Sequence, residues 1–124
     1  MSKKKIGLTK RQIDSIRRKM KSGSIYRDPR YVKWRKKVFE RDRYVCQLSG
    51  EAGGHLEAHH IIPKSDRPDL IFDLDNGITL RKIEHKWLHE NNFVLKYREK
   101  FQKLAKKNKP KPKLIKSARK IKKR

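Results

Sequence analysis

Apolar residues near the start of the chain recur at helical spacing after a basic leader. Thr9-Lys10-Arg11-Gln12 has the form of a capping box, in which the Thr and Gln side chains cap the first turn of a helix. Ile13, Ile16 and Met20 follow at the spacing of one helix face. The pattern predicts a short helix from about Lys10 to Lys21.

A second helix is predicted to begin at Asp28-Pro29, because Asp caps helix N-termini and Pro favours the first helical position. It runs to about Arg41, and its apolar residues are Tyr31, Trp34, Val38 and Phe39. Trp34 has two interpretations, as a core residue or as a residue that stacks on a nucleobase. Its helical spacing favours the core.

The centre of the chain alternates as a strand does. A short extended run over 44–48 is closed by Ser49-Gly50, and a longer alternation from His55 ends at Pro63. One face of this strand carries Leu56, Ala58 and His60, and the other carries Glu57, His59 and Ile61.

The remaining pattern predicts a loop, a strand and two helices. The loop spans 64–75, Asn76-Gly77 is a strong hairpin or turn signal, and Ile78 and Leu80 indicate a second strand. One helix is predicted over about 82–90 and another over about 93–107. The apolar side of the last helix is Leu95, Tyr97, Phe101 and Leu104. The order of elements predicts a small α+β fold.

Charge is distributed unevenly along the 124 residues, whose net charge is +24. Residues 1–30 carry eleven Lys/Arg against two acids, 31–97 carry twelve against ten, and 98–124 carry fourteen against one. A near-neutral middle between basic ends implies a polyanionic partner that the ends bind. We therefore divide the chain into an N-terminal basic arm with a short helix (1–30), a core (31–93), and a C-terminal helix with a basic tail (94–124).

The sequence has no apolar run long enough for a membrane span, and Met-Ser-Lys-Lys-Lys lacks the apolar segment of a signal peptide. Cys46 is the only cysteine, so no internal disulfide can form. A reducing, cytoplasmic location in a bacterial or phage-infected host cell is expected.

Four of the five histidines lie between Leu56 and His89. A His-His pair, an Asn-Gly dipeptide and a His-x-x-x-His at one-turn helical spacing together resemble the HNH, or ββα-metal, endonuclease family over roughly Trp34 to His89. The resemblance implies a small ββα-metal core, with flanking helices and basic N- and C-terminal extensions. It also implies hydrolysis of phosphodiester bonds to 5′-phosphate and 3′-hydroxyl ends.

Carried over to this sequence, the resemblance implies that His59 is a metal ligand and His60 the general base. Asn76 would hold the loop and fix the orientation of the base, and Glu57 would support the site. Adjacent residues of a flat strand point to opposite faces. His59 and His60 can therefore act on one phosphate only if the strand bends or the substrate reaches both.

His85 matches the family's second metal ligand, and His89, one helical turn later, matches a third ligand present in one branch. The implied cofactor is one divalent metal ion, Mg²⁺ or Mn²⁺, with Zn²⁺ or Ni²⁺ as alternatives because imidazole suits those ions.

Many members of the family also hold a structural zinc ion between two Cys-x-x-Cys knuckles. The matching positions here are Cys46, Ser49, Arg81 and Glu84, and one thiolate cannot form a tetrahedral site. No structural zinc is expected, which favours a phage or homing-type branch. Buried apolar residues would replace it, the candidates being Trp34, Val38, Tyr44, Leu48, Trp87 and Leu88.

The leading hypothesis is a metal-dependent endonuclease that nicks or cuts double-stranded DNA as a monomer or weak homodimer. Alternatives are a non-catalytic nucleic-acid-binding protein on the same fold and an RNA-binding basic protein, and the latter leaves the histidines unexplained. The basic face of the first helix is either solvated or in contact with phosphates. The predicted nucleic-acid-binding residues are Arg17, Arg18, Lys19, Lys106, Lys107, Lys109, Lys111, Lys113, Arg119 and Lys120.

Overall fold

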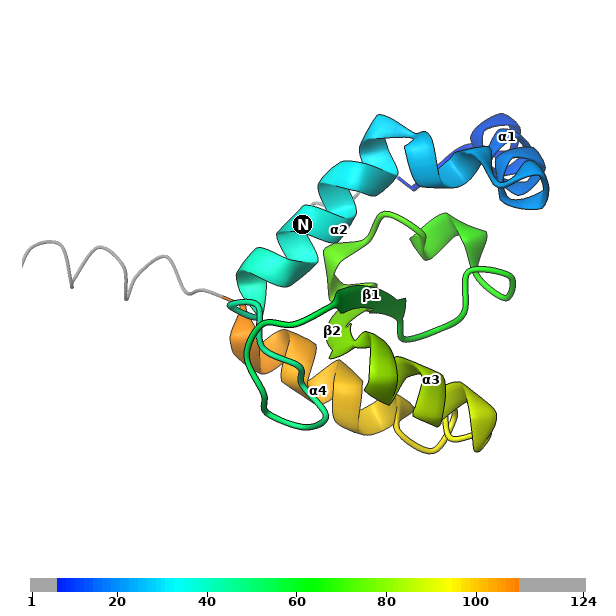
Figure 1. Cartoon of the computed structure of the whole chain (residues 1–124). Coiled ribbons are helices and arrows are strands. Elements are labelled where there is room, and N and C mark those ends of the chain that lie inside the picture. The colour runs from blue at the N-terminus through cyan, green and yellow to red at the C-terminus, as the bar shows by residue number, and fades with distance from the viewer. Residues whose placement is uncertain (1–6, 110–124) are drawn as a thin grey trace, which may run out of the picture.

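The computed structural model describes residues 7–109. The chain forms α1 (Lys10–Ser22), α2 (Pro29–Arg41), β1 (Leu56–His60), β2 (Gly77–Arg81), α3 (Lys82–Glu90) and α4 (Arg98–Asn108). Three short 3₁₀ helices, Ser24–Arg27, Pro68–Leu70 and Leu74–Asn76, lie in the connections. Over residues 7–109, four α-helices around a two-stranded antiparallel sheet confirm the α+β prediction (Figure 1).

The predicted ends of α1 and α2 are confirmed. Thr9 Oγ1 accepts a hydrogen bond from the Gln12 amide at 3.2 Å, and Gln12 Oε1 accepts one from the Thr9 amide at 2.8 Å, so the capping box is formed. Gly23 ends α1 in the left-handed region at φ 85°, which glycine adopts without steric cost. Asp28 caps α2 by accepting from the Arg30 amide at 2.9 Å.

The strands β1 and β2 pair in a register that sets Leu56 opposite Arg81 and His60 opposite Gly77. The prediction of a turn at Asn76-Gly77 is wrong, because Gly77 has extended backbone at φ −122° and begins β2. Because Gly77 has no side chain, Val38 and Trp34 of α2 can pack directly against its backbone. A Cβ there would lie 2.6 Å from Val38 Cγ2 and 2.7 Å from Trp34 Cζ2.

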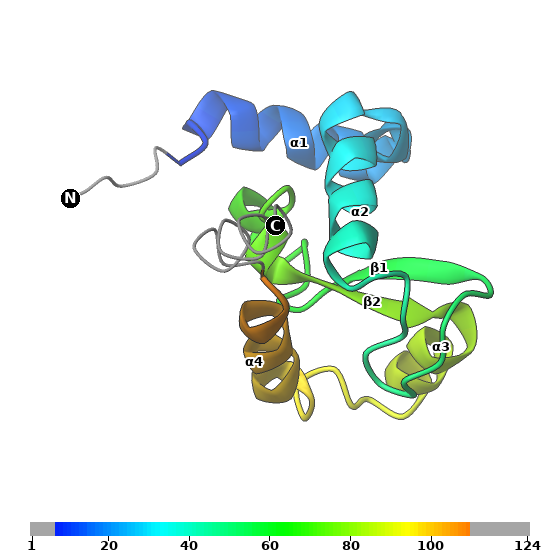
Figure 2. The ribbon, with the colours of Figure 1, turned by 90° about the vertical axis from the view of Figure 1, so that its left-hand side faces the viewer.

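The hairpin separates two hydrophobic clusters, with α1 and α2 on one side and α3 and α4 on the other (Figures 1 and 2). The α2-side cluster contains Ile16, Ile25, Tyr31, Trp34, Val38 and Ile71. The α3-side cluster contains Cys46, Ile61, Ile78, Leu80, Leu88, Phe101 and Ala105. Segments assigned to the two arms by sequence thus supply buried residues to the same folded unit as the core.

A buried ion pair joins α2, β2 and α4. The Arg41 guanidinium donates to the Asp42 carboxylate at 2.8 and 2.9 Å and to the carbonyl oxygens of Leu74 and Gly77. The same carboxylate accepts from the Thr79 amide and from the Asn108 side chain, both at 2.9 Å. Because these partners satisfy both charged groups, the pair fixes the end of α4 against the hairpin.

Three sequence predictions fail at the edges of the fold. The last helix begins at Arg98 rather than 93, and Leu95 is 71% exposed in the turns that precede it. The prediction that Tyr44 and Trp87 are buried is wrong, since their exposed fractions are 44% and 41%. The run over 44–48 is a turn with one isolated bridge between Val45 and Ala52, since Arg43 and Tyr44 have positive φ.

Within the described residues, no helix has the length and apolar character that crossing a membrane requires.

Candidate metal centre and active site

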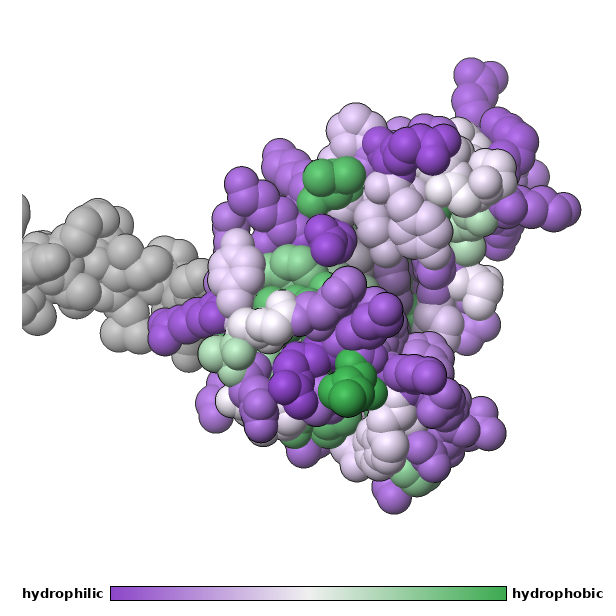
Figure 3. Space-filling model, in the orientation of Figure 1, coloured by the Kyte–Doolittle hydropathy of each residue, from purple (hydrophilic) through white to green (hydrophobic). Residues whose placement is uncertain are grey.

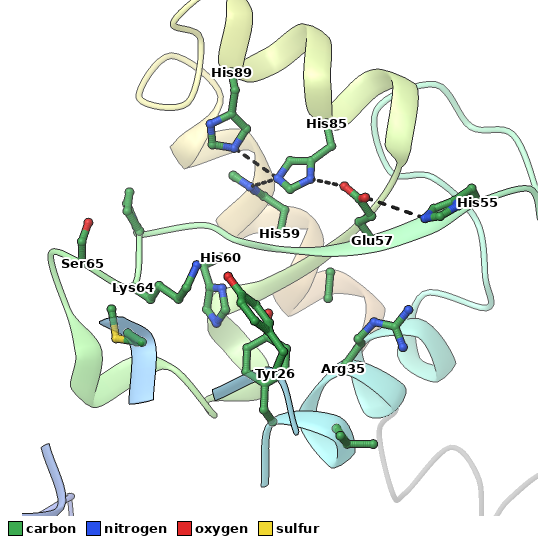
Figure 4. Close-up of a pocket in the computed structure, with 15 residues that line it drawn as sticks. Tyr26, Arg35, His55, Glu57, His59, His60, Lys64, Ser65, His85 and His89 are labelled. Carbon is green, nitrogen blue, oxygen red and sulfur yellow. Dashed lines mark hydrogen bonds and ion pairs between the residues drawn. The ribbon is translucent and has the colours of Figure 1, made fainter. Parts of the chain in front are cut away.

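The extended backbone of β1 places four successive residues, Glu57 to His60, along one cleft of about 840 Å³. Side chains from both faces of the strand line it, because β2 pairs with only one edge of β1 and the cleft follows the other. His59 points toward α3 and His60 toward α2, as the alternation predicts (Figure 4). The two histidines share one cavity without a bend in the strand.

Three imidazoles converge on the α3 side of the cleft. His59 Nδ1 lies 3.2 Å from His85 Nε2, and His89 Nε2 lies 3.1 Å from the same atom (Figure 4). His85 and His89 come from successive turns of α3 and share one helical face. These are the donor atoms of the only group of three or more potential metal ligands in residues 7–109.

Glu57 sets the tautomer of His85. Its Oε1 lies 2.7 Å from His85 Nδ1, and because a carboxylate only accepts, Nδ1 carries the proton and Nε2 presents a lone pair. A carboxylate behind a histidine is the arrangement that orients metal-binding imidazoles in proteins. His55 Nε2 lies 3.8 Å from the other oxygen of Glu57 at the cleft rim.

The three-histidine cluster fits a divalent transition metal. Two nitrogens bound to one tetrahedral zinc ion lie about 3.3 Å apart, given Zn–N bonds of about 2.0–2.1 Å, and the two observed separations are close to that value. Burial, with the charges of His85 and His89, lowers the pKa of His59 to about 2, so its imidazole is neutral near pH 7 as metal binding requires.

His59 also carries an unsatisfied nitrogen. The residue is 3% exposed, its ring edge faces Phe101, and within the described chain Nε2 is buried without a hydrogen-bond partner. A buried polar atom without a partner costs about 1–3 kcal/mol. Binding of a cation by Nδ1 would offset this cost.

His60 occupies a different environment on the α2 side. Its Nε2 lies 3.0 Å from the carbonyl oxygen of Ile71, which only accepts, so Nε2 carries the proton and Nδ1 presents the lone pair. The imidazole stacks on the Trp34 indole at 4.1 Å and 10° between planes. Nδ1 makes no hydrogen bond with the described residues and is not sealed from solvent. Burial lowers the pKa of His60 to about 4.

Asn76 holds the loop that follows β1. Its Oδ1 accepts from the Ile62 amide at 2.9 Å and its Nδ2 donates to the Ile62 carbonyl at 3.0 Å. Its side chain makes no hydrogen bond to His60, whose ring is held by Ile71 and Trp34. The amide therefore fixes the backbone two residues beyond the base.

The four positions that match zinc knuckles come together through other contacts. The Arg81 guanidinium donates to both Glu84 carboxylate oxygens at 2.9 and 2.8 Å, and Cys46 Sγ lies 3.8 Å from Glu84 Oε1. The Ser49 amide donates to Cys46 Sγ at 3.4 Å. An ion pair and a thiol thus connect the segments that the knuckles join in other proteins, and the absence of structural zinc stays a prediction.

The predicted nucleic-acid-binding residues occupy varied environments. Arg17 and Arg18 are exposed on α1, and Lys106 and Lys107 are exposed on α4. Lys19 pairs with Asp28 at 2.9 Å and Lys109 with Asp75 at 3.0 Å. Hydrophilic residues cover most of the face in Figure 3. The others, Lys111, Lys113, Arg119 and Lys120, lie outside the described residues.

The sequence did not indicate three further cleft residues, Tyr26, Arg35 and Lys64. Lys64 follows the His pair by four positions, and its positive charge is among the causes that lower the pKa values of His59 and His60. Tyr26 and Arg35 come from the segment before the motif. Only the packing of α2 against the hairpin brings them to the cleft, so no local sequence signal could have found them.

The two strands, the helix that follows them and the three imidazoles between them form a ββα unit that could hold a metal ion. Residues 46–96, less than half of the chain, match the family model described as HNH endonuclease. No curated protein and no solved structure matches the chain significantly.

Proposed function

We propose that this protein is a metal-dependent endonuclease that hydrolyses phosphodiester bonds in double-stranded DNA. One observation carries the proposal. Within a single cleft, three imidazole nitrogens converge on one point while a fourth histidine, held separately, keeps a free lone pair. Metal binding and proton abstraction are the two tasks that phosphodiester hydrolysis requires.

His60 is the general base of the proposed reaction. Nδ1 accepts a proton from water as the water oxygen bonds to phosphorus and the bond from phosphorus to the 3′ oxygen breaks. The leaving oxygen takes up a proton from solvent. The Ile71 carbonyl keeps the second ring proton on Nε2, and the Trp34 stack limits rotation of the ring. A positioned base of this kind contributes about 10²–10⁴-fold to the rate.

His59, His85 and His89 would hold the divalent ion, and Glu57 would orient His85. A bound ion would neutralise charge on the phosphate and on the leaving oxygen. Because Glu57 bonds to His85 rather than joining the cluster, the ligand set is all imidazole. Imidazole suits Zn²⁺ and Ni²⁺ better than Mg²⁺ or Mn²⁺, so we place Zn²⁺ and Ni²⁺ first.

Double-stranded DNA is proposed as the substrate because the charge of the chain lies mainly outside the near-neutral middle. The basic ends would contact phosphates while the ββα unit approaches the strand to be cut. The absence of a thiolate set at the knuckle positions supports a phage or homing-type enzyme. The second candidate is a non-catalytic DNA-binding protein, which the basic ends alone would favour.

Incubation of the full chain with supercoiled plasmid, separately with Mg²⁺, Mn²⁺, Zn²⁺ and Ni²⁺, tests the proposal. The expected result is open-circular or linear DNA with at least one ion and none in the presence of a chelator. His60→Ala, assayed in parallel, should bind the plasmid without cutting it. Binding by the wild type without cleavage under every ion would establish the non-catalytic alternative.

A further inference from the structure

Two basic side chains line the cleft without an acidic partner. Lys64 and Arg35 each lie more than 4.0 Å from every carboxylate in the described part of the chain, whereas Arg30, Arg41, Arg67, Arg81 and Lys86 all form ion pairs. The only acid in the cleft lining is Glu57, which bonds to His85. The cleft therefore holds two positive charges that no carboxylate of residues 7–109 neutralises.

Aromatic rings support both cations. Lys64 Nζ lies 5.7 Å from the ring centroid of Tyr26, and the Arg35 guanidinium carbon lies 4.9 Å from that of Phe39. An aromatic face attracts a cation and restricts its position without cancelling its charge. The two side chains are thus oriented but still available to an anion.

Their placement relative to His60 indicates which anion they bind. Lys64 extends from the loop after β1 and Arg35 from α2, and Figure 4 shows them on opposite sides of His60. In a DNA strand every phosphodiester lies between two others. A strand whose scissile phosphate sits at His60 would carry its neighbouring phosphates toward these two cations.

We propose that Lys64 and Arg35 form a clamp that binds the two phosphates flanking the scissile phosphate of the cut strand. The clamp rests on the proposed nuclease function for the identity of the strand, but it makes a separate claim about binding. Arg forms bidentate contacts with phosphate oxygens and Lys acts as a point charge, so both residue types suit this role.

The test compares Lys64→Ala and Arg35→Ala with Lys37→Ala in the full chain. Lys37 is exposed, lies two residues from Arg35 on α2 and therefore points away from the cleft, so it is a matched control for loss of one charge. The first readout is affinity for a short DNA duplex at several salt concentrations, with a chelator present to prevent cleavage. Each clamp variant should reduce the slope of log K against log salt by about 0.9, the value for one phosphate contact.

The second readout separates flanking phosphates from the scissile one. Bis(p-nitrophenyl) phosphate is a phosphodiester without neighbouring phosphates. The clamp variants should show a raised KM on duplex DNA and a smaller loss of activity on this substrate than on duplex DNA, whereas His60→Ala should fail on both substrates. Unchanged salt slopes in both clamp variants, or an equal loss in Lys37→Ala, would overturn the clamp. A wild type that binds with the expected slopes but hydrolyses neither substrate would overturn the nuclease function and leave the clamp as a binding site.

Discussion

The two faces of β1 place adjacent histidines in different surroundings. On the α3 side, His59 joins His85 and His89 in a polar cluster in which His85 is supported by a carboxylate. On the α2 side, His60, the next residue, is held by an indole face and a backbone carbonyl. Adjacent imidazoles therefore have different partners and different free nitrogens.

In the proposed enzyme, one strand thereby separates metal binding from proton abstraction. The carboxylate on His85 favours a lone pair directed at a shared point, which suits a cation. The carbonyl and indole on His60 favour a single lone pair that faces the cleft, which suits a proton. Because the cleft follows the free edge of β1, side chains from both faces of the strand reach it. The alternation of side chains therefore gives His59 and His60 different surroundings within one cavity.

The largest effect is expected for His60→Ala. Cleavage should fall by about 10²–10⁴-fold because only the base is lost, while duplex binding and far-UV circular dichroism stay as in the wild type. The measurement is single-turnover cleavage of a labelled duplex at saturating enzyme. Wild-type rates in this variant would show that the α2 face has no part in proton transfer.

Glu57→Gln tests whether the carboxylate on the α3 face supports metal binding by His85. The amide keeps the shape of the side chain but weakens the hold on His85, and loss of such a partner typically costs 10–100-fold in metal affinity or activity. Calorimetric titration with Ni²⁺ or Zn²⁺ measures the metal affinity. Glu51→Gln, whose carboxylate contacts Arg81 rather than a histidine, is the control. Equal affinities of Glu57→Gln and the wild type would mean that the carboxylate does not support the cluster.

Gly77→Ala tests the support of the α2 face. The new methyl group would meet Val38 and Trp34 at 2.6 and 2.7 Å, which forces the indole against His60. Overpacking of this kind costs about 1–3 kcal/mol, and cleavage should fall more than metal affinity. Urea denaturation gives the stability, with Gly7→Ala as the control because no atom lies within 4 Å of its Cβ position. Full stability with unchanged cleavage would show that the indole does not position His60.

Deletion of residues 110–124 should leave both faces intact and have the smallest effect. The segment contains eight Lys/Arg and no acid, and Asn108, which bonds to Asp42, is retained. The slope of log K against log salt should shrink by about 0.9 for each phosphate that the shortened chain no longer neutralises, and cleavage should recover at low salt. An identical slope in both forms would mean that this segment does not bind DNA.

Local patterns predicted the elements that carry the site. The ends of α1 and α2 follow from Thr9, Gly23 and Asp28, whose side chains or conformations act within a few residues. The bounds of α3 and the opposite faces of His59 and His60 follow from periodicity. These features depend on neighbours in sequence, so the sequence alone contains them.

Features that depend on distant packing were missed or misread. Gly77 looks like a turn residue beside Asn76. The position is glycine because Trp34, 43 positions earlier, leaves no room for a Cβ there. The exposure of Tyr44 and Trp87 depends on which helices cover them. The partners of His60 come from α2 and from the loop at Ile71, and no spacing rule connects them.

Calorimetric titration of Ni²⁺ into four variants tests most directly the claim that the two faces of β1 have separate tasks. His59→Ala and His85→Ala should lose metal binding, His89→Ala should lose less, and His60→Ala should bind as tightly as the wild type. The reason is that three nitrogens converge on the α3 face while His60 Nε2 bonds to Ile71. Unchanged affinity in His85→Ala, or a loss in His60→Ala equal to that in His85→Ala, would contradict this division of tasks.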